Sequence, residues 1–268
     1  MDTLRFQPEL QQFIDIVTLD TCPRAILLQG PSGCGKDLFA RLLSEKLDLQ
    51  ICDLTQAIID NTLDATLKVQ GTRVPTLYNI YLDQLSLKDQ NALLRTVEKP
   101  ACGAYLVLHA ATTDTIATLV NRCQQFTFRE YSKESLQKLY PETAELLLQI
   151  CETPGQVECY QHENLNEYVT LVENMFNNFA RASISSILTI SNRFKWTSQD
   201  EISKLDVGLF CKVLLRRSIE AARAKSACID LYRAVAALCV KQATPRVDKR
   251  RVFESFLLEV KERKYTWC

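Results

Sequence analysis

Short apolar runs alternate with stretches of helical spacing over the first half of the chain. The runs are rich in β-branched and aromatic residues, which predicts strands. Between them, apolar residues recur three to four positions apart, as in Leu38, Leu42 and Leu43, which predicts helices. The alternation predicts an α/β fold over residues 1–129: a parallel sheet covered by helices, with each strand buried on both faces. The predicted strands are Ala25–Gln29, Leu49–Leu54, Tyr78–Asp83, Ala104–Ala110 and Gln124–Phe128.

After Phe128 the strand pattern ends and only helical spacing remains, so we predict an all-α second half. The turn signal Thr153-Pro154-Gly155 and the polar stretch His162–Asn166 divide it into a small helical subdomain, 130–165, and a larger helical domain, 166–268. The predicted helices are Lys133–Leu139, Pro141–Glu152, Leu165–Ala180, Ile184–Asn192, Leu205–Ala224, Ala227–Gln242 and Arg246–Glu262.

The composition adds limits on size and partners. The chain has 268 residues, of which 47% are hydrophobic and 24% charged, enough for a sizeable core. Lys+Arg and Asp+Glu both total 32, so the net charge gives no electrostatic reason to expect the whole molecule to coat nucleic acid or membrane, and any basic surface must be local. The longest apolar runs, such as Ala104–Leu108, are far shorter than the about 20 residues a bilayer span needs, so we expect no membrane partner.

The 11 cysteines are scattered, their number is odd, and we expect no secretory leader. We therefore expect reduced thiols in a cytoplasmic protein. No pair has the C-x-x-C spacing of structural zinc sites, so we expect no zinc, and most cysteines are interpreted as small buried hydrophobic residues.

A candidate phosphate-binding loop lies at Gly30-Pro31-Ser32-Gly33-Cys34-Gly35-Lys36-Asp37, between a predicted strand and a predicted helix. This context is typical of a P-loop. The backbone amides and the positive end of the helix would face an anion, and Lys36 would reach the outer phosphates of ATP or ADP. The alternative is a glycine-rich turn with a chance lysine.

Asp37 stands where a P-loop normally has Ser or Thr, whose hydroxyl ligates magnesium. A carboxylate also binds Mg²⁺, but it places a negative charge near the phosphates. Two unit charges 4 Å apart repel by roughly 4 kcal/mol at an effective dielectric of about 20. We therefore predict weak nucleotide binding that depends strongly on magnesium.

A second acidic motif, Asp83-Gln84, ends the third predicted strand where P-loop ATPases of this kind carry Asp-Glu. Asp83 is expected to hold magnesium through water. Gln84 occupies the position of the general base, which contributes about 10²–10⁴-fold, but it is neutral and only orients water. The alternative for Asp83 is a helix cap, although Ser86 and Asp89 already form a capping-box pattern.

The next predicted helix contains the string Gln90-Asn91-Ala92-Leu93-Leu94-Arg95-Thr96-Val97-Glu98-Lys99-Pro100. It resembles bacterial DNA polymerase III delta-prime and gamma/tau subunits and their replication factor C relatives, whose corresponding helix reads close to Q-N-A-L-L-x-T-x-E-x-P. This string is much more specific than a P-loop alone. The chain thus resembles the AAA+ clamp-loader ATPases, through motifs over residues 8–165 and through helical character beyond.

The segment Ala117–Gln124 is similar to the clamp-loader segment that ends in Ser-Arg-Cys, with Asn121 in place of the serine. The resemblance implies that Arg122 is an arginine finger acting in trans on the phosphates of a neighbouring subunit. The alternative is an arginine paired with a surface carboxylate. The resemblance also implies a polar sensor near the γ-phosphate, at Thr112 or Thr113.

The resemblance further implies that residues 130–165 are a helical lid and that 166–268 are a collar-like oligomerisation domain. The lid turn Thr153–Val157 lacks the arginine that often contacts nucleotide in the family. Together with Asp37 and Gln84, three nucleotide-handling positions depart from the active pattern, which favours a stator-like subunit with impaired ATPase activity. The four-cysteine zinc module of many relatives is also absent, because Cys52 stands alone in that interval.

The function implied is that of a delta-prime-like clamp-loader subunit. It would assist ATP-dependent loading of a sliding clamp onto primer-template DNA, in a hetero-pentamer with gamma/tau-like and delta-like subunits. An independent AAA+ ATPase that remodels another replication partner, such as a helicase loader, stays open. A small-molecule P-loop kinase is a third class, against which the Ser86–Pro100 helix and Asn121-Arg122-Cys123 argue.

Two features of the last helices each have two interpretations. Apolar stripes that include Leu209, Val213, Leu214, Leu231, Val235 and Leu238 would form either a ring contact or the core of the domain itself. The tail Lys241–Lys264, with eight basic and four acidic residues, is interpreted as a solvated helix face or a contact with DNA.

Overall fold

The computed structural model describes residues 4, 6–70, 74–111, 115–178, 181–197, 204–244, 247–263 and 265. Its contacts divide the chain into two compact units. The first comprises Met1–Thr143 and Glu152–Cys159, and the second Ala144–Cys151 and Tyr160–Cys268. Each unit is described by itself below, and the predicted three-domain division at residues 129 and 165 stays a prediction.

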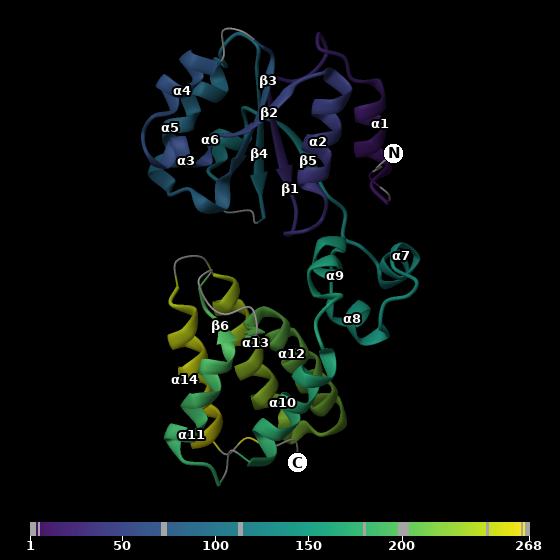
Figure 1. Ribbon diagram of the computed structural model, residues 1–268, viewed down its shortest axis with the longest axis vertical. Helices are drawn as coiled ribbons and strands as arrows, with labels where there is room; N and C mark the ends of the chain where they lie inside the picture. The colour runs from purple at the N-terminus through teal and green to yellow at the C-terminus, as the bar shows by residue number, and fades with distance from the viewer. Residues whose placement is uncertain are drawn as a thin grey trace. The chain divides into compact units, whose positions relative to one another are not determined.

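The first unit contains a parallel five-stranded sheet, as the alternating pattern predicts (Figure 1). Its strand order is β2-β3-β4-β1-β5. After β1 the chain crosses to β2 at one edge, and after β4 it crosses to β5 at the other edge. Neighbouring strands β1 and β4 therefore form a topological switch point, where ligands of open α/β sheets bind. The strands are β1 (Ala25–Gln29), β2 (Gln50–Asp53), β3 (Thr76–Tyr81), β4 (Ala104–Ala110) and β5 (Gln124–Thr127).

Helices cover both faces of this sheet, each face with its own apolar core. Ile26 and Leu28 pack with α1 (Pro8–Ile16) and α2 (Lys36–Leu47) on one side. Leu27 and Leu106 point to the opposite side, because successive strand residues alternate. Figure 1 shows the helices of that side together, left of the sheet: α3 (Thr55–Ile59), α4 (Leu63–Gln70), α5 (Leu87–Glu98) and α6 (Ala117–Val120). Helices α7 (Lys133–Leu139) and α9 (Pro154–Tyr160) complete the unit.

The expectation that every strand is buried on both faces is wrong for the two edge strands. In β2 and β5 three of the four residues are exposed, whereas β4 is buried throughout. The pattern of apolar letters cannot reveal this, because an edge strand is covered incompletely by the flanking helices. The sheet is therefore fully buried only at its centre, where β1, β4 and β3 lie.

The described residues of the second unit form helices and one short strand pair. It contains α8 (Glu145–Ile150), α10 (Leu165–Asn178), α11 (Ile184–Leu188), α12 (Val207–Ala224), α13 (Ile229–Ala243) and α14 (Lys249–Glu262). The prediction of an all-α half missed a two-residue parallel pair, β6 (Phe194–Lys195) with β7 (Leu205–Asp206). A pair this short carries no periodicity that a sequence pattern could reveal. No described helix has the length and apolar character to cross a membrane.

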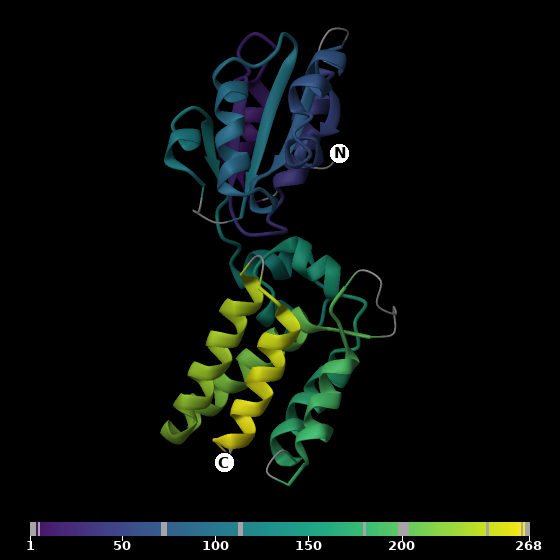
Figure 2. The same cartoon turned by 90° about the vertical axis from the view of Figure 1, so that its left-hand side faces the viewer.

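The apolar stripes of the last helices form the core of this unit. Figures 1 and 2 show α13 and α14 side by side, and α12 packs on α13. Their stripe residues are almost fully buried inside the unit, so the domain-core interpretation holds for these side chains. They are Leu209, Val213, Leu214, Leu231, Val235, Leu238, Phe256, Leu257 and Val260.

Candidate functional site

The phosphate-loop motif joins β1 to α2 at the switch point of the sheet. Gly33 and Gly35 have φ angles of 78° and 107°, a left-handed backbone that residues with a Cβ rarely adopt. Gly35 is the N-cap of α2 and provides no side-chain cap. The amides of the first turn are therefore available to an anion at the positive end of the helix, which is the arrangement of a phosphate site.

Lys36 is almost completely buried at the start of α2. Its ammonium donates to the carbonyl oxygens of Gly30, at 2.6 Å, and Pro31, at 2.9 Å. Its Nζ also lies 3.9 Å from Sγ of Cys34, a buried thiol whose pKa is raised by its burial. The Lys36 ammonium is thus hydrogen-bonded to the loop itself. To contact a bound phosphate, it would have to turn away from these carbonyl oxygens.

The N-terminal end of α9 packs directly on this loop within the first unit. The Thr153 hydroxyl donates to the Ser32 carbonyl at 2.9 Å, and the Gly155 amide donates to the Gly33 carbonyl at 2.9 Å. The two glycines meet so closely that a Cβ on Gly155 would lie 2.7 Å from the Gly33 Cα. The loop conformation is therefore coupled to α9, the helix that begins at the predicted lid turn.

Asp37 lies beside the carboxyl ends of β3 and β4. The Tyr81 hydroxyl donates to its carboxylate at 2.8 Å, and Nδ1 of His109 lies 3.7 Å from the same oxygen. Tyr81 and His109 are register partners whose rings stack 4.7 Å apart. On its other side, His109 places Nε2 3.0 Å from Oδ1 of Asn79. Two strand residues thus flank the acidic residue of the loop on the β3–β4 side, and Asn79 supports one of them, His109.

Burial sets the protonation of this cluster. It lowers the pKa of His109 to about 4, and the nearby Asp37 carboxylate opposes the shift only partly, so the imidazole is neutral near pH 7. Burial, followed by the hydrogen bond to Asp37, also raises the pKa of Tyr81, so the phenol keeps its proton and donates it. Asp37 itself remains largely exposed, at 74% of its side chain.

The acidic motif Asp83-Gln84 and the two sensor candidates, Thr112 and Thr113, are the next predicted site residues. Both oxygens of Asp83 accept the Ala111 amide, at 2.9 and 3.2 Å, so this carboxylate links the turn after β3 to the end of β4. Asp83 is not the cap of α5, which was the alternative interpretation. The predicted capping box of that helix is made by Ser86 and Asp89. Gln84 is exposed. Thr112 and Thr113 lie outside the described residues.

Arg122 follows α6 and is about one-third exposed, at 38% of its side chain. Its Nε lies 2.5 Å from Glu98, and another guanidinium nitrogen donates to the Thr118 carbonyl at 2.7 Å. The surface ion pair considered as the alternative for this residue is therefore present. It leaves part of the guanidinium open to solvent, so both interpretations of Arg122 remain compatible with its position.

Sequence reasoning missed Asn79, Tyr81 and His109 as parts of the site. The available signal was polarity: each interrupts an otherwise apolar central strand near its carboxyl end. In a parallel sheet the carboxyl ends of neighbouring strands meet at one edge. The contacts of Tyr81 and His109 with Asp37, however, require β4 to lie next to β1 and β3, and the sequence pattern does not reveal this strand order.

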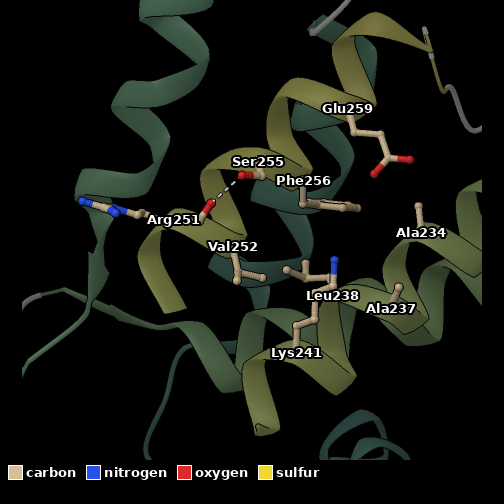
Figure 3. Close-up of a pocket in the computed structure, with 9 residues that line it drawn as sticks. All are labelled: Ala234, Ala237, Leu238, Lys241, Arg251, Val252, Ser255, Phe256 and Glu259. Atoms are coloured by element: carbon tan, nitrogen blue, oxygen red, sulfur yellow. Dashed lines mark hydrogen bonds between the residues drawn. The ribbon is translucent and has the colours of Figure 1, made fainter. Parts of the chain in front are cut away.

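A separate groove of about 230 Å³ lies between α13 and α14 in the second unit (Figure 3). Ala234, Ala237 and Val252 line it, with Leu238 and Phe256 at its base. Lys241, Arg251 and Glu259 also line it. Among the described residues, it contains no buried polar atom without a hydrogen-bond partner and no group of side chains that could hold a metal ion, so nothing there identifies a ligand. The phosphate loop therefore remains the candidate functional site.

Comparisons with known proteins support the fold. No protein-family model matches the chain. A proteasome-associated ATPase from Catenulispora acidiphila is 29% identical over 94 residues, which are 35% of this chain but only 15% of that protein. A DNA polymerase III gamma subunit-related protein from Thermotoga maritima superposes with a TM-score of 0.53 at 12% identity, over 98% of this chain and 100% of that chain. The chain thus has the fold of that gamma subunit-related protein, a parallel sheet covered by helices and followed by a helical region, as its sequence predicts.

Proposed function

We propose that this chain is a delta-prime-like clamp-loader subunit that binds ATP or ADP at Gly30–Asp37 and hydrolyses it poorly. It assists the loading of a sliding clamp onto primer-template DNA, in a ring with gamma/tau-like and delta-like subunits. The observation that carries the proposal is a formed phosphate loop beside Tyr81 and His109, with neutral Gln84 after Asp83. The superposition with the gamma subunit-related protein supports the choice of assembly.

The residues of the site fit a nucleotide with a divalent cation. The first-turn amides of α2 and Lys36 would hold the phosphates. Asp37 would hold the cation, whose chemistry is to neutralise phosphate charge. Close to Asp37, Nδ1 of His109 is buried and has no hydrogen-bond partner among the described residues. Because Asp37 adds a negative charge near the phosphates, affinity without the cation should be low.

Calorimetric titration tests the binding half of the proposal. We expect weak ATP binding with Mg²⁺, much weaker binding in EDTA, and tighter Mg²⁺-dependent binding by Asp37→Thr, which restores the hydroxyl. Lys36→Ala should remove binding. Tight binding in EDTA, or no gain on Asp37→Thr, would contradict the assignment of Asp37.

Steady-state phosphate release tests the catalytic half. The isolated chain should release phosphate negligibly, because Gln84 accepts no proton from water and a general base contributes about 10²–10⁴-fold. Turnover at the rate of an active clamp loader, lost on Lys36→Ala, would show that the stator-like assignment is wrong.

The partial similarity to a proteasome-associated ATPase favours a second candidate, an independent remodelling ATPase. The two candidates differ in their partners. Affinity purification from the host, with proteins identified by mass spectrometry, should recover gamma/tau-like and delta-like subunits in fixed stoichiometry under the first proposal. A self-assembled ring without these subunits would favour the second.

A further inference from the structure

Two acceptor atoms face each other beside the phosphate loop with no donor between them. His109 is 1% exposed, and its Nε2 lies 3.0 Å from the carbonyl oxygen Oδ1 of Asn79. Because an amide oxygen only accepts, Nε2 carries the ring proton and Nδ1 presents a lone pair. This Nδ1 has no hydrogen-bond partner among the described residues and lies 3.7 Å from Oδ1 of Asp37.

A cation bound between Nδ1 of His109 and Oδ1 of Asp37 would accept a lone pair from each atom. Metal–nitrogen and metal–oxygen bonds of about 2.0–2.2 Å allow one ion to join both atoms across that gap. The two flanking groups act as supports outside the coordination sphere. Asn79 fixes the tautomer of the imidazole and the Tyr81 hydroxyl orients the carboxylate from 2.8 Å, as outer partners do around metal sites.

We propose that Asp37 and His109 form a half-site for a divalent transition-metal ion, such as Mn²⁺ or Co²⁺, completed by phosphate oxygens of the bound nucleotide. The inference rests on the proposed nucleotide binding and deepens it. Magnesium takes oxygen ligands, whereas an imidazole nitrogen favours transition metals. Two protein ligands are too few for tight binding of the ion alone. No group of three His, Cys, Asp or Glu side chains that could hold a metal ion occurs among the described residues. The ion should therefore enter with the nucleotide.

The geometry also assigns different tasks to the two ligands. The buried imidazole is held in place by ring stacking on Tyr81 and by Asn79, so it is a preformed ligand. The Asp37 side chain is 74% exposed, lies in the first turn of α2 and is oriented by the Tyr81 hydroxyl, so it has more room than the imidazole to adjust to the ion and to the phosphates. The carboxylate places the ion within reach of the His109 nitrogen, and this nitrogen shifts the preference of the site from magnesium toward transition metals.

Pulsed electron paramagnetic resonance of the Mn²⁺–ADP complex tests this directly. In protein labelled with ¹⁵N-histidine, the electron spin echo should carry a ¹⁵N modulation, which nitrogens of the adenine ring cannot produce. His109→Gln should remove the modulation and lower the Mn²⁺-dependent ADP affinity at least about tenfold. His162→Gln, which alters the other histidine of the chain, should change neither.

Asp37→Ala provides a second variant that leaves the buried core intact, because this side chain is exposed. It should lower the Mn²⁺-dependent ADP affinity comparably, and Asp37→Thr should shift the preference from Mn²⁺ toward Mg²⁺. Bound Mn²⁺–ADP without a ¹⁵N modulation would overturn the half-site while the proposed function stands. No ADP binding with Mn²⁺ or Mg²⁺ would overturn the proposed function itself.

Discussion

At the residue scale, two glycines that are far apart in the sequence determine whether the phosphate loop keeps its shape. A Cβ on Gly155 would lie 2.7 Å from the Gly33 Cα and 3.1 Å from the Gly33 carbonyl oxygen. Both are backbone atoms, so the clash could be relieved only by a shift of the backbone. The contact therefore transmits any change at the start of α9 into the loop.

Gly155→Ala should lower the free energy of unfolding by about 1–3 kcal/mol, the usual cost of overpacking. It should also weaken ATP binding, because the Gly33 backbone must shift away. Denaturant unfolding and calorimetry measure the two effects. Gly208→Ala is the matched control, since its Cβ would meet only side-chain atoms, at 3.1 Å. Equal behaviour of the two variants would show that the glycine contact is not needed.

His109 gives the folded protein a pH dependence of known sign. Its pKa is about 6.5 in the unfolded chain and is lowered to about 4 by burial in the folded one, so protonation favours unfolding. The neutral imidazole therefore makes its full contribution to the free energy of unfolding above pH 6.5, and this contribution is lost as the pH falls toward 4. The slope is at most about 1.4 kcal/mol per pH unit, or about 3 kcal/mol in all.

Urea unfolding in EDTA between pH 7.5 and 4 measures this effect, with His109→Gln as the comparison. The wild type should lose about 3 kcal/mol more than the variant over this range, since glutamine does not titrate. His162→Gln should follow the wild type. Parallel curves for wild type and His109→Gln would show that the imidazole protonates without cost in the folded state.

At the scale of elements, an aromatic cluster holds the second unit together. Phe253 of α14 is fully buried, and its ring lies 5.1 Å from Phe194 and 5.7 Å from Phe210, with edge-to-face geometry. Trp196 adds a tilted contact at 5.6 Å. The cluster joins α12, α14 and the short β6 strand, so one side chain supports three elements.

Phe253→Ala should lower the stability of the second unit by about 3–5 kcal/mol, the typical cost of removing a buried ring. Circular dichroism during denaturant unfolding should show an early transition, while ATP binding to the folded first unit persists. Tyr232→Ala, at a partly exposed ring of α13, should change stability by less than about 1 kcal/mol. A single late transition in Phe253→Ala would contradict the role of the cluster.

At the scale of the whole molecule, Arg122 distinguishes a ring component from a solitary ATPase. Both members of its ion pair with Glu98 are more than one-third exposed, so the pair should contribute less than about 1 kcal/mol to stability. Arg122→Ala should therefore leave folding and the chain's own nucleotide affinity nearly unchanged. In a reconstituted complex, ATPase activity at the adjacent site should fall about 10³–10⁵-fold.

The controls separate a specific finger from a general loss of charge. Arg122→Lys should rescue activity poorly, because lysine lacks the planar fork that engages two oxygens. Arg129→Ala removes another exposed arginine, paired with Glu9, and should leave the complex active. Loss of the chain's own nucleotide binding in Arg122→Ala, or full activity of the assembled complex, would refute the trans-acting role.

The sequence by itself determined the features that depend on short stretches of chain. The apolar runs located all five strands of the sheet, three of them shifted by one or two residues at their ends, and Ser86 with Asp89 indicated the capping box of α5. The motif Gly30–Asp37 indicated a loop whose glycines adopt left-handed backbone angles. These predictions succeed because periodicity, capping and turn chemistry act between residues a few positions apart.

Only the tertiary structure decided which side chains meet at the site. Tyr81 and Asp37 are 44 residues apart, and Thr153 and Ser32 are 121 apart. Their contacts follow from the strand order β3-β4-β1 and from the packing of α9 on the loop. Tertiary packing also decides which residues are buried. It buries His109, which lowers the pKa of the imidazole, and it leaves most of β2 and β5 exposed. Such features depend on the desolvation and distances that arise when distant segments pack, and no local pattern of residues encodes them.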